Sequence, residues 1–219
     1  MISWALLQRL EALVMRGSFE EASRQLPGLW SLFPSSERPE KIWILGFAAY
    51  AEYRTGEVEA AIDHADQAAK LVAQGPPVHN YYINALDRLA ELRLVRWRES
   101  GFARSGAARG LELSAVAACR VLRQAARIFP FAVPLASLEN GLLAWGKQEK
   151  PRATALFRDG IRAAQRMGLT YHEARLQRTL ASASSDGRER EQATRRAAHL
   201  QRQLGIGESA LGMRTIVDA

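Results

Sequence analysis

The sequence predicts an all-helical fold of stacked antiparallel helical pairs, and three observations favour it. Apolar residues recur at three- and four-residue steps along most of the chain. No segment shows a sustained alternating strand pattern flanked by turn residues. Small residues recur at matching places in successive segments, which indicates an internal repeat. A single helical pair cannot bury its own apolar face, so stacking of neighbouring pairs must supply the core.

The first two segments predict a helical pair. The apolar stripe of the first helix consists of Trp4, Leu7, Leu10, Leu13 and Val14. Gly17 and Ser18 end this helix, and residues 19–26 give a second, shorter helix that Pro27 ends. The proline- and serine-rich stretch 34–40 is expected to be a loop.

The remaining helices are also expected in pairs. In chain order they cover residues 41–54, 57–73, 80–98, 107–129, 135–147, 151–167, 171–181 and 188–204. Pro151 suits the first turn of its helix because the N–H that it lacks would be unpaired there. We expect residues 1–204 to form one repeat domain, and residues 205–219, which have little periodicity, to form a mobile C-terminal tail.

Small residues mark the expected seams between helices. Ala22 follows Gly17 by five positions, and Ala61 follows Gly56 by the same step. Later in the chain, one helix carries Gly141 and its partner carries Ala153, Phe157 and Gly160. Alanine and glycine allow two antiparallel helices to approach closely, so we expect these positions to lie where helices touch.

The small–large–small runs and the closing proline resemble degenerate tetratricopeptide repeats. Residues 125–204 more specifically resemble the C-terminal repeat tails of multidomain bacterial adenylate cyclases, serine/threonine kinases and LuxR/MalT-type regulators. In those proteins a repeat array follows an ATPase module. The runs that carry this resemblance are AARIFPFAVPLA, GLLAWGKQEKPRATALFRDGIRAAQRMGLTYHEARL and DGREREQATRRAAHLQRQLG. Residues 1–125 match only as generic helical pairs.

The resemblance implies a right-handed solenoid of about five helical pairs that serves protein interaction or sensing and carries no catalysis. The chain has no GxxxxGK[ST] phosphate loop and no HRD or DFG kinase motif. It is therefore either a segment of a longer signalling protein or a freestanding relative, and the sequence leaves both open.

Composition and charge exclude several classes of protein. The single cysteine, Cys119, excludes a disulfide scaffold and a cysteine-built zinc site. No apolar run approaches a membrane span, and the first residues lack the pattern of a secretory signal, so we expect a cytoplasmic protein without a membrane partner. The net charge of +7 favours acidic partners, including nucleic acid. Arginine far outnumbers lysine, which reflects either selection for bidentate contacts or a GC-rich genome.

Residues that could support catalysis do not gather in the sequence. The four histidines lie in different segments, and none is spaced from another as helical metal ligands are. His64 lies between Asp63 and Asp66, but on a helix these are more simply solvated residues than metal ligands. Cys119 lies in an apolar helix and is expected to fill core volume. We therefore expect no enzymatic activity, no cofactor and no metal.

The resemblance places the first helix of each pair along the concave surface of the array. Aromatic rings with polar tips, together with arginine, are typical of a peptide-binding groove. The predicted partner-binding residues are Trp43, Tyr50, Tyr53, Arg54, Tyr82, Arg88, Leu142 and Trp145. Core packing is the alternative for Trp43 and Trp145. The expected partner is a protein or peptide, such as an ATPase, cyclase or kinase domain of the same polypeptide, and self-association through these aromatics stays open.

The arginine-rich last helix offers a second candidate surface. Its charged residues are Arg188, Glu189, Arg190, Glu191, Arg195, Arg196 and Arg202. One interpretation is the polar face of a capping helix, which a terminal repeat needs in water. The alternative is an anion-binding face for nucleic acid or an acidic protein. No aromatic residue is interleaved with these arginines, so nucleic acid is the less favoured partner.

Overall fold

A computed structural model describes residues 2–102 and 106–212 of the chain. Within these two ranges the chain forms ten α-helices and no strand, which confirms the predicted all-helical class. The helices are α1 (Ile2–Arg16), α2 (Phe19–Leu32), α3 (Arg38–Thr55), α4 (Val58–Val72), α5 (Ile83–Glu99), α6 (Gly106–Ile128), α7 (Val133–Gly146), α8 (Lys150–Arg166), α9 (Thr170–Ala183) and α10 (Gly187–Leu204). The 3₁₀ turn η1 (Phe33–Ser35) joins α2 to α3, η2 (Pro130–Ala132) joins α6 to α7, and η3 (Glu208–Leu211) follows α10.

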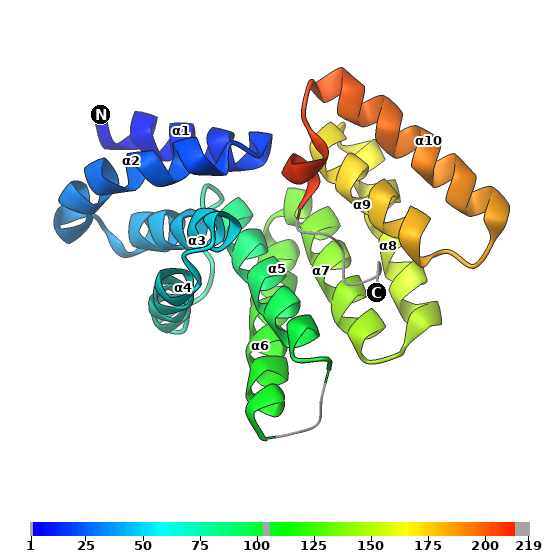
Figure 1. Ribbon diagram of the computed structural model, residues 1–219, viewed down its shortest axis with the longest axis horizontal. Coiled ribbons are helices and arrows are strands. Elements are labelled where there is room, and N and C mark those ends of the chain that lie inside the picture. Colours follow the sequence, from blue (N-terminus) through cyan, green and yellow to red (C-terminus); the bar gives the residue numbers. More distant parts are fainter. Residues whose placement is uncertain (1, 103–105, 213–219) are drawn as a thin grey trace.

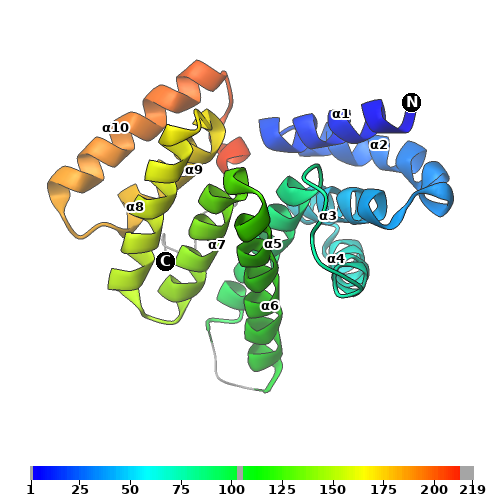
Figure 2. The same cartoon turned by 180° about the vertical axis from the view of Figure 1, so that it is seen from behind.

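The helices pack in sequence order. Each odd-numbered helix packs on the even-numbered helix that follows it, and α1, α3, α5, α7 and α9 also pack on one another in series. Figures 1 and 2 show that the array bends, so that α1 and α2 at one end face α9 and α10 at the other. We call the surface to which the odd-numbered helices contribute the inner face.

The inner helices α3, α5 and α7 are buried around most of their circumference, because each has neighbours in its own layer and in the outer one. The outer helices are amphipathic instead. In α6, for example, Ala115, Cys119 and Leu122 are buried, while Arg120 and Arg123 face water.

Small residues lie at the seams between helices. A Cβ atom added to Gly46 of α3 would lie 2.8 Å from the Cβ of Ala85 in α5. One added to Gly141 would overlap the ring of Phe157, and one added to Gly160 would lie 2.9 Å from Ser137 Cβ. The predicted seam positions Gly141 and Gly160 are therefore confirmed.

Two predicted boundaries near the N-terminus are wrong. Helix α2 continues through Pro27 to Leu32, because Leu29 on the following turn is buried in the core and its burial offsets the lost hydrogen bond. The stretch 34–40 is only partly a loop, since α3 begins at Arg38. There the side chain of Glu40 accepts from the backbone N–H of Glu37 at 3.0 Å, as part of a capping box.

The predicted mobile tail is also wrong in part. Residues 205–212 dock on the array, with Ala210 and Leu211 buried and η3 in contact with both α1 and α9. The rest of that prediction, residues 213–219, lies outside the described residues. In the part of the chain that the structure describes, no helix combines the length and the apolar character needed to cross a bilayer.

Candidate functional site

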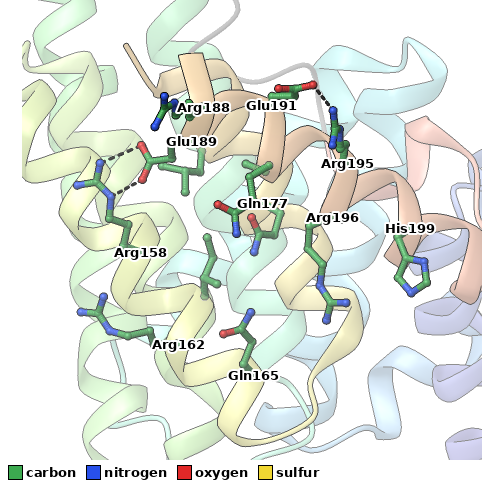
Figure 3. Close-up of a pocket in the computed structure, with 14 residues that line it drawn as sticks. Arg158, Arg162, Gln165, Gln177, Arg188, Glu189, Glu191, Arg195, Arg196 and His199 are labelled. Carbon is green, nitrogen blue, oxygen red and sulfur yellow. Dashed lines mark hydrogen bonds and ion pairs between the residues drawn. The ribbon is translucent and has the colours of Figure 1, made fainter. Parts of the chain in front are cut away.

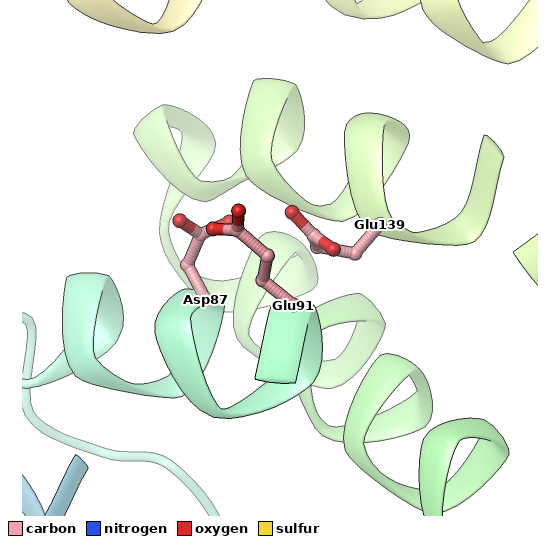
Figure 4. Close-up of side chains that lie close together, drawn as sticks. All are labelled: Asp87, Glu91 and Glu139. Atoms are coloured by element: carbon pink, nitrogen blue, oxygen red, sulfur yellow. The ribbon is translucent and has the colours of Figure 1, made fainter. Parts of the chain in front are cut away.

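A cluster of five charged side chains lies under the inner face, in the middle of the array. Asp87, Arg88 and Glu91 come from α5, Glu139 from α7 and Arg175 from α9. We call these five residues the ionic cluster. Each of them is at most 4% exposed. Figure 4 shows the three carboxylates converging between α5 and α7.

Arg175 connects the three helices of the ionic cluster. Its Nη1 donates to Asp87, and its Nη2 donates to Glu91 at 3.0 Å and to Glu139 at 3.1 Å. Arg88 donates to Glu91 at 2.7 Å and to the hydroxyl of Tyr171. Charges that are removed from water need such partners, because desolvation otherwise destabilises the folded state.

The protonation of this region follows from its burial. Burial, together with the charge of Asp87, raises the pKa of Glu139 well above its usual range, although Arg175 acts in the opposite direction. The second oxygen of Glu139, Oε2, has no hydrogen-bond partner among the described residues, which also disfavours the ionised form. Burial and the charges of Arg175 and Arg88 lower the pKa of the neighbouring His172 to about 3. A neutral Glu139 makes the ionic cluster electrically balanced, with two carboxylates against two guanidinium groups.

The three carboxylates do not fit a metal site. One oxygen each of Asp87, Glu91 and Glu139 lies within 4.8 Å of the other two, which is a spacing that divalent cations can bridge. The guanidinium of Arg175, however, already donates to all three carboxylates. A cation there would face the positive charges of Arg175 and Arg88 at close range, so the geometry fits an internal ion-pair network instead.

Residues 205–212, which we call the C-terminal segment, lie on the inner face between α1 and α9 (Figure 1). Polar side chains of the array hold its backbone carbonyls. Arg54 donates to the carbonyl of Ser209 at 3.2 Å, and Tyr171 donates to that of Ala210 at 2.6 Å. Arg178 donates to the carbonyl of Glu208 at 2.9 Å.

Close approach also holds this segment in place. A Cβ atom added to Gly17, at the end of α1, would lie 3.0 Å from the backbone nitrogen of Ala210. One added to Gly212 would lie 2.6 Å from a carboxylate oxygen of Glu91 in the ionic cluster. Tyr171 joins the two features, because its hydroxyl accepts from Arg88 and donates to Ala210.

The structure buries most of the predicted partner-binding residues. The expectation that they are exposed in a groove is wrong for Trp43, Tyr50, Tyr82, Arg88 and Leu142, each of which is at most 5% exposed. The reason is that neighbouring inner helices pack on one another and cover these side chains. Tyr50 thus donates to Glu91 at 3.1 Å, and Leu142 lies in an apolar core together with Leu138 and Phe157.

The other three predicted residues are partly exposed. Tyr53 donates to Glu99 at 2.5 Å, and the ring of Trp145 lies under the ammonium of Lys150 at 5.1 Å. Arg54 stacks over the ring of Phe19 at 4.1 Å and binds the C-terminal segment. The structure therefore brings Tyr50, Arg54 and Arg88 together around that segment and the ionic cluster, and leaves Tyr53 and Trp145 apart from them.

The arginine-rich surface of the last helix borders an open pocket of about 770 Å³ between α8, α9 and α10 (Figure 3). Most of its arginines are already paired. Arg158 makes a bidentate pair with Glu189 at 2.7 and 2.9 Å, and Arg196 makes one with Glu173 at 2.8 and 3.1 Å. The described residues that line this pocket include no phenylalanine, tyrosine or tryptophan, and His199 is the one ring among them, so stacking of nucleic-acid bases has little support there.

His64 and Cys119 have structural surroundings. His64 stacks on Trp30 at 4.6 Å and contacts Glu52 at 2.7 Å, while Asp66 pairs with Arg93. The sequence neighbours of His64 therefore do not gather around it. Cys119 is fully buried, and burial raises the pKa of its thiol, so the predicted core position is confirmed.

Sequence reasoning missed Asp87, Glu91, Glu139 and Arg175. One signal was present, because Glu139 is the only charged residue in the apolar run of α7. Another was the four-residue spacing of Asp87 and Glu91, which places both on one face of α5. Their partner Arg175 lies 88 positions beyond Asp87, and no local pattern connects the two.

Comparison of the chain with models of known protein families and with curated proteins finds no match.

Proposed function

We propose that this chain is a non-enzymatic interaction module whose inner face binds a segment of a partner protein. The single observation that carries the proposal is the docked C-terminal segment. It lies on the inner face, and three side chains from two inner helices bind its main-chain carbonyls. A surface that holds one peptide segment in this way has the chemistry to hold another.

The contacts also indicate what kind of segment fits. Because Arg54, Tyr171 and Arg178 bind carbonyl oxygens, they discriminate little between side chains. Selection comes from the buried positions of Ala210 and Leu211 and from the close approach at Gly17. The favoured ligand is a chain segment with small or apolar residues at its centre.

The serial packing of inner helices supports a solenoid of about five helical pairs as part of this proposal. The resemblance of residues 125–204 to repeat tails of bacterial signalling proteins supports a regulatory role. In that role the bound segment comes from another protein or from another domain of the same polypeptide. A preformed face requires little ordering of the array on binding.

The test uses the full chain with its own segment released. Ala210→Asp combined with Leu211→Asp places two charges at buried positions, so we expect the C-terminal segment to leave the inner face. A fluorescein-labelled peptide GIGESALG, with the sequence of residues 205–212, is then titrated and followed by fluorescence anisotropy. We expect the double variant to bind this peptide at least about tenfold more tightly than the unchanged chain.

Two further variants check this result. Gly207→Asp also adds a negative charge, but at an exposed position where an added Cβ atom meets only Ser209 Oγ, at 3.7 Å, and it should behave like the unchanged chain. Arg54→Ala with Arg178→Ala in the released background should weaken peptide binding about tenfold, because two donors to the carbonyls are lost. Absence of peptide binding by a double variant that keeps its helical circular-dichroism signal would contradict the proposal.

An acidic partner on the α8–α10 surface is the second candidate. The specific observation in its favour is the excess of arginine around the pocket there, where Arg188 makes no ion pair with a described residue. Association with a polyanion such as heparin would then fall steeply between 50 and 200 mM salt. A flat salt dependence would count against it.

A further inference from the structure

A second pocket opens on the inner face at the opposite end from α9. It has a volume of about 410 Å³ and lies between α1, α3 and the beginning of α5. Three aromatic side chains line it: Trp4, Trp43 and Tyr81. Their ring centroids are 4.8 to 5.5 Å apart, so the rings form one continuous aromatic wall. Trp4 is 40% exposed and Tyr81 is half-buried, so a ligand can reach these two rings, while the buried Trp43 packs behind them.

The carboxylate of Glu11 also lines this pocket. Trp43 Nε1 donates to one of its oxygens at 2.9 Å, and Asn84 Nδ2 donates to the other at 2.6 Å. These two bonds fix the position of the carboxylate and leave a second lone pair on each oxygen. Glu11 is thus a positioned acceptor beside three aromatic rings.

No basic side chain of the described part of the chain forms an ion pair with Glu11. Arg88 acts on it electrostatically, but the guanidinium of Arg88 is bound to Glu91 and Tyr171. Burial raises the pKa of Glu11, with Asn84, Trp43 and Arg88 acting in the opposite direction. Glu37 and Glu40 add negative potential near Tyr81. The pocket is therefore locally acidic in a chain whose net charge is +7.

We propose that this pocket binds a cationic side chain, an arginine or a lysine, of the segment that occupies the inner face. The negative faces of aromatic rings attract a cation within about 6 Å of the ring centroid. The carboxylate of Glu11 supplies the opposite charge and two open acceptor positions. Both features favour positive charge, and a neutral side chain gains less from each of them.

This inference rests on the proposed function for the source of the cation, but the pocket can be tested separately. The C-terminal segment contains neither arginine nor lysine. Its contacts are with Gly17, Arg54, Tyr171 and Arg178, none of which lines this pocket. Binding of the peptide GIGESALG should therefore not depend on Glu11.

The experiment titrates the full chain with N-acetyl-arginine methylamide and, separately, with the citrulline analogue. The two probes have the same shape, but only the first is charged. Binding is followed by the NMR signals of the indole N–H groups of Trp4 and Trp43. We expect saturable shifts of both signals with the arginine probe, and an affinity at least about fivefold weaker for citrulline.

Two variants locate the interaction. Glu11→Gln removes the charge while keeping an acceptor, and Trp4→Leu removes an exposed ring whose loss does not empty the core. Each should weaken binding of the arginine probe at least about fivefold. Glu20→Gln is the matched control, because it removes an exposed carboxylate on α2 and should leave binding unchanged.

Equal binding of the arginine and citrulline probes would overturn the inference. So would unchanged binding by Trp4→Leu and by a folded Glu11→Gln variant. If the arginine probe fails while GIGESALG binds the released chain, only the cation pocket is disproved. If the arginine probe binds and the peptide does not, the pocket stands and the proposed peptide surface is disproved.

Discussion

Glu139 illustrates how one residue connects burial to protonation. It lies in an otherwise apolar helix, and it is fully buried beside Asp87 and Glu91. Burial disfavours its charge, and the two guanidinium groups of Arg175 and Arg88 cannot neutralise three carboxylates, so the neutral form of Glu139 is favoured. The folded chain thus holds a proton that the unfolded chain releases above the ordinary pKa of 4.5.

This difference predicts a pH-dependent gain in stability for Glu139→Gln. A raised folded-state pKa means that the unchanged chain loses stability as the pH rises from about 4.5 toward that pKa. Glutamine does not titrate and can still accept from Arg175. We expect the free energy of unfolding of the variant to exceed that of the unchanged chain by about 1–3 kcal/mol at pH 8, and by little at pH 4.5. Urea unfolding at both pH values measures this, and a gap independent of pH would contradict it.

At this scale the sequence predicted residue types better than residue surroundings. Arg54 and Arg88 were predicted as inner-face residues because the resemblance to repeat arrays places the first helix of each pair on that face. Their burial and partners were not predicted, since these depend on how closely neighbouring inner helices approach. The bond from Arg88 to Tyr171, for example, joins residues 83 positions apart.

The contact between α3 and α5 shows what determines how closely two neighbouring inner helices pack. Gly46 lies against Ala85, so only the methyl group of Ala85 lies between the two helix backbones. This close contact brings Tyr50 within hydrogen-bond distance of Glu91. The geometry of the ionic cluster therefore depends on a glycine in a neighbouring helix.

Substituting this glycine should separate the two helices. In Gly46→Ala the new methyl group would lie 2.8 Å from the Cβ of Ala85 and 3.0 Å from its carbonyl oxygen. Because backbone atoms cannot move aside cheaply, we expect a loss of about 1–3 kcal/mol in the free energy of unfolding. Thermal and urea unfolding followed by circular dichroism measure this loss.

Gly110→Ala is the matched control for that substitution. Gly110 lies within α6, and a Cβ atom there would meet nothing within 4 Å. Alanine should therefore stabilise the chain by about 0.5–1 kcal/mol through its higher helix propensity. Equal effects of the two substitutions would show that the α3–α5 contact is not tight.

Most elements could be predicted because apolar periodicity and turn glycines are local signals. The errors arose where tertiary contacts outweigh local preference. Burial of Leu29 extends α2 past Pro27, and burial of Ala210 and Leu211 orders a segment that has no periodicity of its own.

At the scale of the whole molecule, Arg175 joins helices that are not sequence neighbours in the array. In a simple repeat array each unit contacts only the adjacent ones. The bonds from Arg175 in α9 reach Asp87 and Glu91 in α5, two helical pairs away. We therefore expect the middle of this array and its C-terminal end to unfold together.

Arg175→Ala should weaken that coupling. Removing one partner of a buried network leaves uncompensated charge, so we expect the free energy of unfolding to fall by about 3–5 kcal/mol. The urea transition should also broaden or separate into two steps. Differential scanning calorimetry tests this through the ratio of the van't Hoff and calorimetric enthalpies.

Arg158→Ala is the comparison for this variant, because it breaks an exposed ion pair with Glu189. It should lower the free energy of unfolding by less than about 1 kcal/mol, and the chain should still unfold in a single transition. A single, unshifted transition for a folded Arg175→Ala variant would show that the ionic cluster does not couple the middle of the array to its C-terminal end.

The short connection between α10 and η3 sets the affinity that an external ligand needs. Residues 205–207 tether the rest of the C-terminal segment, residues 208–212, beside its own docking surface. This tether corresponds to an effective concentration in the millimolar range. A competitor that makes the same contacts displaces it only above that concentration. A ligand that works at lower concentrations must gain affinity from contacts that the tethered segment does not make.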